Sequence, residues 1–136
     1  MSFSRFSERP SGLRIIAGSR KGARIFAPRG LEVRPTGDRV REAVFNLIGP
    51  VDGADVLDLF AGSGALGLEA LSRGAARAVF VEKHRPAWEG LAQTLKKIGE
   101  DKTSRAVEAG AVAALARLAD AGERFDIVLA DPPYEK

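Results

Sequence analysis

A glycine-rich segment and an acid at a fixed distance after it are residues whose types and spacing could do chemistry. Residues 62–67, GSGALG, match the pattern G-x-G-x-x-G, and Glu82 stands twenty residues after Gly62. Glycines at these positions permit a tight strand-to-helix turn, which brings a ligand close to the N-terminus of the helix. An acid at this spacing can bind two ribose hydroxyls. The pattern predicts a nucleotide-type cofactor, although such a turn also occurs without a ligand.

Two other features favour S-adenosylmethionine over NAD as that cofactor. Asp58 lies inside the apolar segment 56–60, where burying a carboxylate costs free energy unless a partner is supplied. The ammonium group of a methionyl moiety, or backbone amides of the turn, would be such a partner. A later apolar segment ends in the loop 131–134, DPPY. We therefore expect the methionyl part of the cofactor beside residues 58–64 and its ribose at Glu82.

The loop 131–134 has the residue types needed to hold an amino group for methylation. Asp131 and the carbonyl of Pro132 could accept the two N–H bonds of an amine and aim its lone pair at the methyl group. Pro132 and Pro133 restrict the backbone of this loop, because proline fixes φ and lacks an N–H. Tyr134 could stack on an extruded base.

The segments that must position these groups alternate between strand and helix. We expect a β-hairpin from runs 13–17 and 23–27 around the loop 18–22, and then a helix capped by Thr36 or Asp38. Spacing predicts that Val40, Val44, Leu47 and Ile48 form the apolar face of that helix. The segments that follow are predicted strands 55–60, 77–82, 104–107 and 125–130 and predicted helices 65–73, 86–98 and 111–121. This order indicates an α/β fold with about four parallel strands covered by helices on both faces.

The positive charge is concentrated in the N-terminal part of the chain. Residues 1–41 carry a net charge of +7, whereas the rest carries −4. A basic segment on a mildly acidic body indicates contact with a polyanion. We expect RNA-binding residues in and after the hairpin: Arg14, Arg20, Lys21, Arg24 and Arg34.

Four strings together resemble one family of enzymes. They are LRIIAG at residues 13–18, RPTGDRVRE at 34–42 with Phe45 and Asn46, DLFAGSGALGLEALSRG at 58–74, and DPPY at 131–134. Across residues 13–136 the chain resembles the bacterial 16S ribosomal RNA guanine-N2 methyltransferases, which are class I methyltransferases with a Rossmann-like sheet. The resemblance implies S-adenosylmethionine as cofactor, and 16S ribosomal RNA or a small-subunit assembly intermediate as partner.

The resemblance also implies roles for individual residues. It implies catalytic roles for Asp131, Pro132, Pro133 and Tyr134, and cofactor-binding roles for Asp58, Phe60, Gly62, Ser63, Gly64, Glu82, Lys83, Ala111, Thr36 and Arg39. One departure is Gly110-Ala111, which stands where the family has a polar residue that contacts adenine. The backbone N–H of Ala111 remains available there. No group of residues has the spacing of metal ligands.

We expect three parts in the chain: a disordered tail at 1–11, the basic hairpin extension at 12–34 and a methyltransferase domain at 35–136. The domain lacks the last strands of a class I sheet, so we expect the chain to be a fragment. No apolar run has the length of a signal sequence or membrane span, which favours a cytoplasmic protein. The alternatives are an amino methyltransferase for adenine or cytosine in DNA or RNA, a non-catalytic nucleic-acid-binding fragment and an NAD-dependent oxidoreductase.

Overall fold

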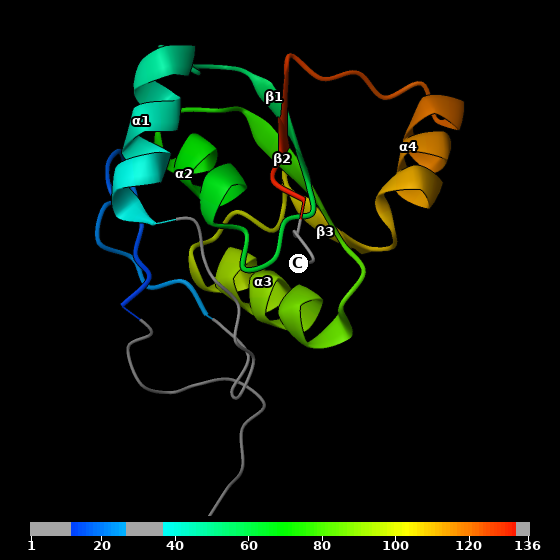
Figure 1. Ribbon diagram of the computed structural model, residues 1–136, viewed down its shortest axis with the longest axis horizontal. Coiled ribbons are helices and arrows are strands. Elements are labelled where there is room, and N and C mark those ends of the chain that lie inside the picture. The colour runs from blue at the N-terminus through cyan, green and yellow to red at the C-terminus, as the bar shows by residue number, and fades with distance from the viewer. Residues whose placement is uncertain (1–11, 27–36, 133–136) are drawn as a thin grey trace, which may run out of the picture.

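The computed structural model describes residues 12–26 and 37–132, which form a parallel sheet flanked by helices (Figure 1). The strand order is β3-β2-β1-β4. The strands are β1 (Asp55–Leu59), β2 (Arg77–Glu82), β3 (Arg105–Glu108) and β4 (Ile127–Ala130). The helices are α1 (Asp38–Ile48), α2 (Ala65–Ser72), α3 (Arg85–Lys97) and α4 (Ala111–Asp120). The four predicted parallel strands are confirmed, although β4 begins later than expected and β3 is shifted by one residue.

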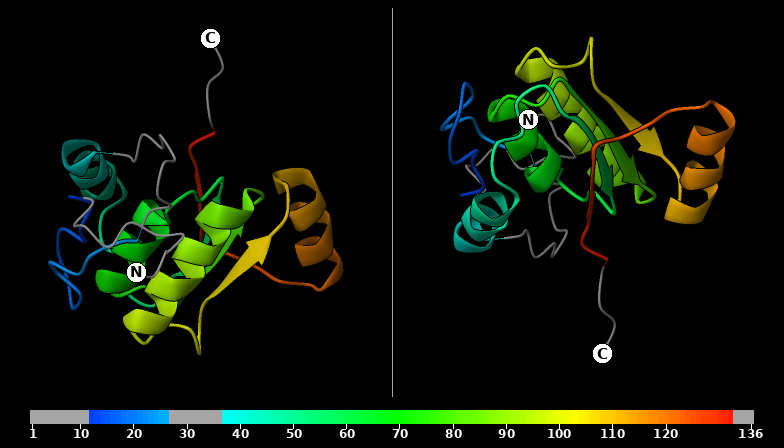
Figure 2. Two further views of the ribbon diagram at one scale, coloured as in Figure 1. Left: turned by 90° about the horizontal axis from the view of Figure 1, so that it is seen from below. Right: turned by 90° about the horizontal axis from the view of Figure 1, so that it is seen from above.

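Helices cover both faces of the sheet, as the apolar strands require (Figure 2). On one face, α2 and α3 enclose a core that includes Leu68, Phe80 and Leu91. On the other face, α4 packs Ala114 and Leu118 against side chains of β1 and β2. Because the strands are parallel, their carboxyl ends lie at a single edge of the sheet, where the loops that precede α2, α3 and α4 also begin.

Helix α1 buries a different face from the one that its apolar spacing predicts. Val40 and Leu47 are 55% and 89% exposed, and the buried residues of the helix are Arg41 and Phe45. The guanidinium of Arg41 binds the carboxylate of Glu69 on α2. The helix therefore places Arg41 against α2 and leaves Val40 and Leu47 exposed to solvent. Gly37 is the N-cap residue and Asp38 is the first residue of the helix, so the prediction of Asp38 as the cap was wrong; Thr36, the other predicted cap, lies outside the described residues.

The N-terminal segment folds back on itself as predicted, but it forms one antiparallel bridge, Arg14 with Arg24, and not two regular strands. Its turn lies against the C-terminal end of α2. There the N–H of Ser19 donates to the carbonyl of Ser72 at 2.8 Å, and the N–H of Arg20 donates to the hydroxyl of Ser72 at 2.9 Å. Leu13, Ile15 and Ile25 are buried in the main core. The hairpin is therefore an integral part of the packed domain.

Gly18 is expected to be essential for this docking. It has φ +87°, and a Cβ at this position would lie 1.9 Å from the carbonyl oxygen of Ser72. We expect Gly18→Ala to lower the free energy of unfolding by about 2–3 kcal/mol, since it adds backbone strain and also pushes the turn away from α2. Gly22→Ala is a matched control, because Gly22 has φ +84° but open space around it. It should cost only about 1 kcal/mol. Equal losses for the two variants in chemical denaturation would contradict this account.

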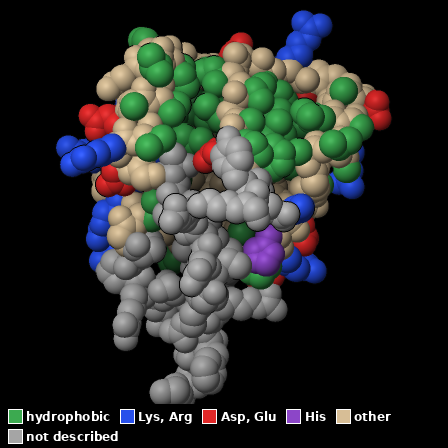
Figure 3. Space-filling model, in the orientation of Figure 1, with side chains coloured by type: hydrophobic (Ala, Val, Ile, Leu, Met, Phe, Trp, Pro, Cys, Tyr) green, Lys and Arg blue, Asp and Glu red, His purple; other side chains and the backbone are tan. Residues whose placement is uncertain are grey.

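Strand β4 forms an edge of the described sheet, with β1 as its partner in that sheet. The outward residue Val128 is 56% exposed, and Val112 and Leu115 of the neighbouring α4 are 84% and 43% exposed. Figure 3 shows hydrophobic side chains gathered across the upper part of the molecule, in the orientation of Figure 1. Within residues 12–26 and 37–132, no helix has the length and apolar character needed to cross a membrane.

A candidate cofactor site at the carboxyl edge of the sheet

The glycine turn between β1 and α2 needs glycine at two positions. Gly64 has φ +84°, and a Cβ there would lie 2.3 Å from Leu91, so a side chain would clash as well as strain the backbone. A Cβ on Gly67 would lie 2.4 Å from the ring of Phe80. Phe60, directly after β1, has φ +55° although it is not glycine. Such a backbone conformation in a bulky residue is uncommon and occurs often in ligand-binding turns.

Glu82 connects the end of β2 to the glycine turn. Its Oε1 accepts the N–H of Gly62 at 2.8 Å, and its Oε2 accepts the N–H of His84 at 2.7 Å. The two bonds hold the carboxylate at the carboxyl edge of the sheet, beside the turn. This is the position in which an acid can meet the ribose of a nucleotide bound at that turn.

Asp58 is a buried carboxyl group beneath the same turn. Its side chain is 2% exposed, and Oδ2 accepts the N–H of Gly67 at 3.0 Å. Burial raises the pKa of Asp58 to about 7; the bond from Gly67 opposes this shift, and the charges of Asp131 and Glu82 add to it. A single amide does not compensate for the buried charge. The carboxylate therefore favours a cationic partner.

Asp131 completes a group of three acids at this edge. It follows β4, which pairs with β1 so that Leu59 is opposite Ala130. Asp58 interacts electrostatically with both Glu82 and Asp131, and Asp131 is exposed. Among the described residues, no group of acids, histidines or cysteines could hold a metal ion. The arrangement is suited to a ligand with positive charge and hydroxyl groups.

The remaining predicted cofactor and catalytic residues lie in different settings. Ser63 is buried in the turn, Lys83 is exposed after β2, and Ala111 is the first residue of α4. Arg39 is exposed in the first turn of α1, and Pro132 is exposed after Asp131. Four predicted site residues lie outside the described residues: Arg34, Thr36, Pro133 and Tyr134.

The basic residues of the hairpin lie away from the glycine turn. The tip of the hairpin contacts Ser72, the last residue of α2, whereas the glycine turn precedes the first residue of that helix. Eight helical residues separate the two ends by about 12 Å. Arg14 donates to the carbonyl of Gly22, and Arg20 is 3.8 Å from Glu100. Lys21 and Arg24 are exposed.

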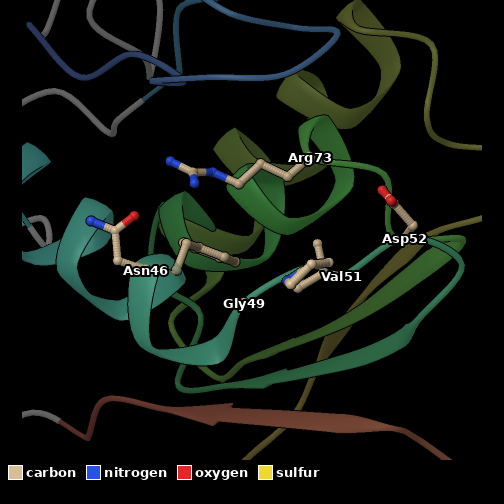
Figure 4. Close-up of a pocket in the computed structure, with 7 residues that line it drawn as sticks. Asn46, Gly49, Val51, Asp52 and Arg73 are labelled. Carbon is tan, nitrogen blue, oxygen red and sulfur yellow. The ribbon is translucent and has the colours of Figure 1, made fainter.

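A hollow of about 420 Å³ lies beside the segment that enters β1 (Figure 4). This is the opposite edge of the sheet from the three acids. The hollow is formed by the last turn of α1, the segment that enters β1 and the C-terminal end of α2. Its lining residues are Phe45, Asn46, Gly49, Pro50, Val51, Asp52 and Arg73. Since the strands begin at this edge, the hollow is separate from the candidate cofactor site.

Two buried charged residues that connect the hairpin, α1 and α2 were not identified from the sequence as site residues. Glu69 and Arg41 are each fully buried and form an ion pair of 3.2 Å. The signal was present for Glu69, because it is the one charged residue in the helix ALGLEALS, much as Asp58 stands between two apolar residues of β1. For Arg41 there was no such indication in the sequence, because the charged neighbours Arg39 and Glu42 predict a solvent-exposed helix face.

Comparisons with known proteins agree with this architecture. The family model described as "Conserved hypothetical protein 95" matches residues 13–136. YlbH of Bacillus subtilis (strain 168) is 42% identical over 125 residues, which cover 91% of this chain and 68% of YlbH. Ribosomal RNA small subunit methyltransferase D of Escherichia coli (strain K12) is also 42% identical, with 91% of this chain and 61% of that protein covered. The chain thus spans about two thirds of the length of these curated relatives.

A solved structure extends the comparison to the fold. The structure of yhhF from Escherichia coli has a TM-score of 0.78 and 44% identity, with 90% of this chain and 65% of that chain covered. The predicted α/β class I methyltransferase architecture is confirmed. The chain belongs to the family Conserved hypothetical protein 95, among whose relatives is ribosomal RNA small subunit methyltransferase D.

Proposed function

We propose that the protein transfers a methyl group from S-adenosylmethionine to the exocyclic N2 amine of a guanine in 16S ribosomal RNA. The observation that carries the proposal is the convergence of Asp58, Glu82 and Asp131 on the glycine turn. S-adenosylmethionine has a cationic amino group for Asp58, ribose hydroxyls for Glu82 and a sulfonium that supplies the methyl group. Similarity to an rRNA methyltransferase of Escherichia coli supports RNA as the substrate.

Guanine N2 is a poor nucleophile, because its lone pair is delocalised into the ring. In the proposed mechanism, the carboxylate of Asp131 accepts one N–H bond of the amine and the carbonyl of Pro132 accepts the other. These two bonds draw electron density onto the nitrogen and direct its lone pair towards the methyl group. The exposure of Asp131 and Pro132 leaves them accessible to a base from outside the domain.

Titration and transfer assays test the proposal in two steps. Calorimetric titration with S-adenosylmethionine and with NAD asks which cofactor the glycine turn prefers. Methyl transfer is then measured on naked ribosomal RNA and on assembled small subunits, with a DNA duplex as control. Tighter binding of NAD would refute the methyltransferase proposal. Methylation of adenine or cytosine in place of guanine N2 would refute the proposed target.

Glu82→Gln is expected to weaken binding of S-adenosylmethionine by about 10- to 100-fold. Hydrogen bonds from two ribose hydroxyls to a charged acceptor contribute more than those to an amide. The glutamine oxygen can still accept the N–H of Gly62, so the glycine turn should persist, although the glutamine NH2 group cannot accept the N–H of His84. Glu108→Gln is the matched control, since Glu108 is opposite Glu82 in the sheet but belongs to β3. Calorimetry measures both variants, and a weaker effect for Glu82→Gln than for Glu108→Gln would contradict the assignment.

A further inference from the structure

Glu69 connects three segments of the chain through one buried carboxylate. Its Oε1 accepts the N–H of Ile16 at 2.8 Å and lies 3.2 Å from a terminal nitrogen of Arg41. Its Oε2 accepts the N–H of Ala17 at 3.1 Å and lies 2.9 Å from Nε of Arg73. The hairpin, α1 and α2 therefore meet at a single side chain.

Arg41 reaches the same point from α1. Its fully buried guanidinium donates to the carbonyl of Arg14 at 2.9 Å and to Asp38 at 2.7 Å, in addition to its bond with Glu69. The hairpin is thus bound on both its N–H and C=O groups, by Glu69 and Arg41 respectively. The buried pair, called here the hairpin clamp, fixes the direction of the hairpin as well as its distance from α2.

Burial of an ion pair contributes little net stability, because the desolvation of two charges offsets most of their attraction. Apolar side chains of similar volume would hold α1 against α2 equally well. They would not accept two backbone N–H groups or donate to a carbonyl. What the charges add is a fixed orientation of the backbone at residues 14–17.

Helix α2 links this orientation to the candidate cofactor site. Its first turn begins at the glycine turn, where Gly67 donates to Asp58, and Glu69 follows Gly67 by two residues. Beyond Glu69, Ser72 receives the N–H of Arg20 on its hydroxyl. A helix of eight residues is stiff on this scale, so the hairpin and the glycine turn keep a constant separation.

We propose that Glu69 and Arg41 are positioning residues, which set the basic hairpin at a fixed place relative to the methyl donor. RNA phosphates bound by exposed Lys21 and Arg24 would then be held in register with the reacting base. The inference rests on the proposed RNA methyltransferase function. Neither residue of the clamp touches RNA or cofactor; they act through the hairpin.

The test compares RNA affinity, cofactor affinity and hairpin protection in three variants. Glu69→Gln removes the charge. The double variant Arg41→Met with Glu69→Leu replaces the pair by apolar side chains that keep the packing. It is therefore expected to fold even if Glu69→Gln does not. Glu123→Gln is the matched control, because Glu123 also binds two arginines, Arg77 and Arg105, but touches no hairpin residue.

We expect both clamp variants to lose hydrogen-exchange protection at the amides of Ile16 and Ala17. Their affinity for ribosomal RNA, measured by fluorescence anisotropy, should fall about tenfold, because phosphate contacts lose their register. Affinity for S-adenosylmethionine should change less than about twofold. Glu123→Gln should alter none of the three quantities.

Two results would overturn the inference. One is unchanged RNA affinity in a folded variant whose hairpin amides have lost protection. The other is an equal loss of cofactor and RNA affinity, which would show a general role in folding. If the parent protein binds neither RNA nor S-adenosylmethionine, the proposed function fails. If the amides of Ile16 and Ala17 keep their hydrogen-exchange protection in the double variant, the hairpin clamp is refuted whatever the function.

Discussion

Asp131→Ala is expected to lower the rate of methyl transfer to RNA by about 10²- to 10³-fold while the protein still binds S-adenosylmethionine. The expected loss is that of a hydrogen-bond partner which acts mainly in the transition state. Single-turnover transfer of a labelled methyl group to ribosomal RNA measures the rate, and calorimetry measures cofactor binding.

The affinity of Asp131→Ala for S-adenosylmethionine can also be predicted, because it depends on the pKa of Asp58. The charge of Asp131 helps to raise the pKa of Asp58, so its removal lowers that pKa and leaves more of the buried carboxylate ionised near pH 7. Affinity for a cationic ligand should therefore stay the same or increase slightly. Asp120→Ala, an exposed acid at the distant end of α4, is the control. Full activity of Asp131→Ala with normal cofactor binding would exclude the catalytic assignment.

The candidate site was predictable because each of its parts leaves a local trace in the sequence. Gly64 and Gly67 are required by steric contacts and backbone conformation, and Asp58 stands out as a charge among apolar residues. The distance from Gly62 to Glu82 reflects one helix and one strand of ordinary length. Parallel pairing then brings these groups to one edge without any further information.

The placement of α1 and the hairpin was not predictable in the same way. Apolar spacing identified Val40 and Leu47 as the buried face, but burial of Arg41 depends on Glu69, which is 28 residues away in the chain. Pairing over that distance leaves no periodic pattern. The same contact orients the hairpin. The hairpin lies at the C-terminal end of α2, away from the glycine turn, and this position also depends on tertiary packing.

The pKa of Asp58 predicts how stability depends on pH in the unliganded protein. The folded-state pKa of about 7 is above the ordinary value of 3.8, so folding favours the protonated form. The stabilisation from that proton is complete below about pH 4 and is lost as pH rises to about 7. Asp58→Asn, which cannot ionise, should therefore raise the free energy of unfolding at pH 7 by up to about 4 kcal/mol.

The same ionisation should make cofactor binding depend on pH in the opposite direction. A cationic amino group binds the carboxylate form, so affinity should fall about fivefold from pH 7 to pH 6 as Asp58 becomes protonated. At pH 6, binding should release close to one proton per complex, which calorimetry in buffers of different ionisation enthalpy detects. Asp58→Asn should bind more weakly at pH 7.5, with little change between pH 6 and 7.

Asp55→Asn separates this effect from any general change in charge, because Asp55 begins the same strand but lies at the opposite edge of the sheet. It should retain the full pH dependence. If Asp58→Asn keeps that dependence too, the titrating group is another one. If the prediction holds, the protein is less stable at neutral pH than its fold allows, because the ionised Asp58 is kept for its ligand. A gain in stability and a loss of affinity from one substitution would then have the same electrostatic cause.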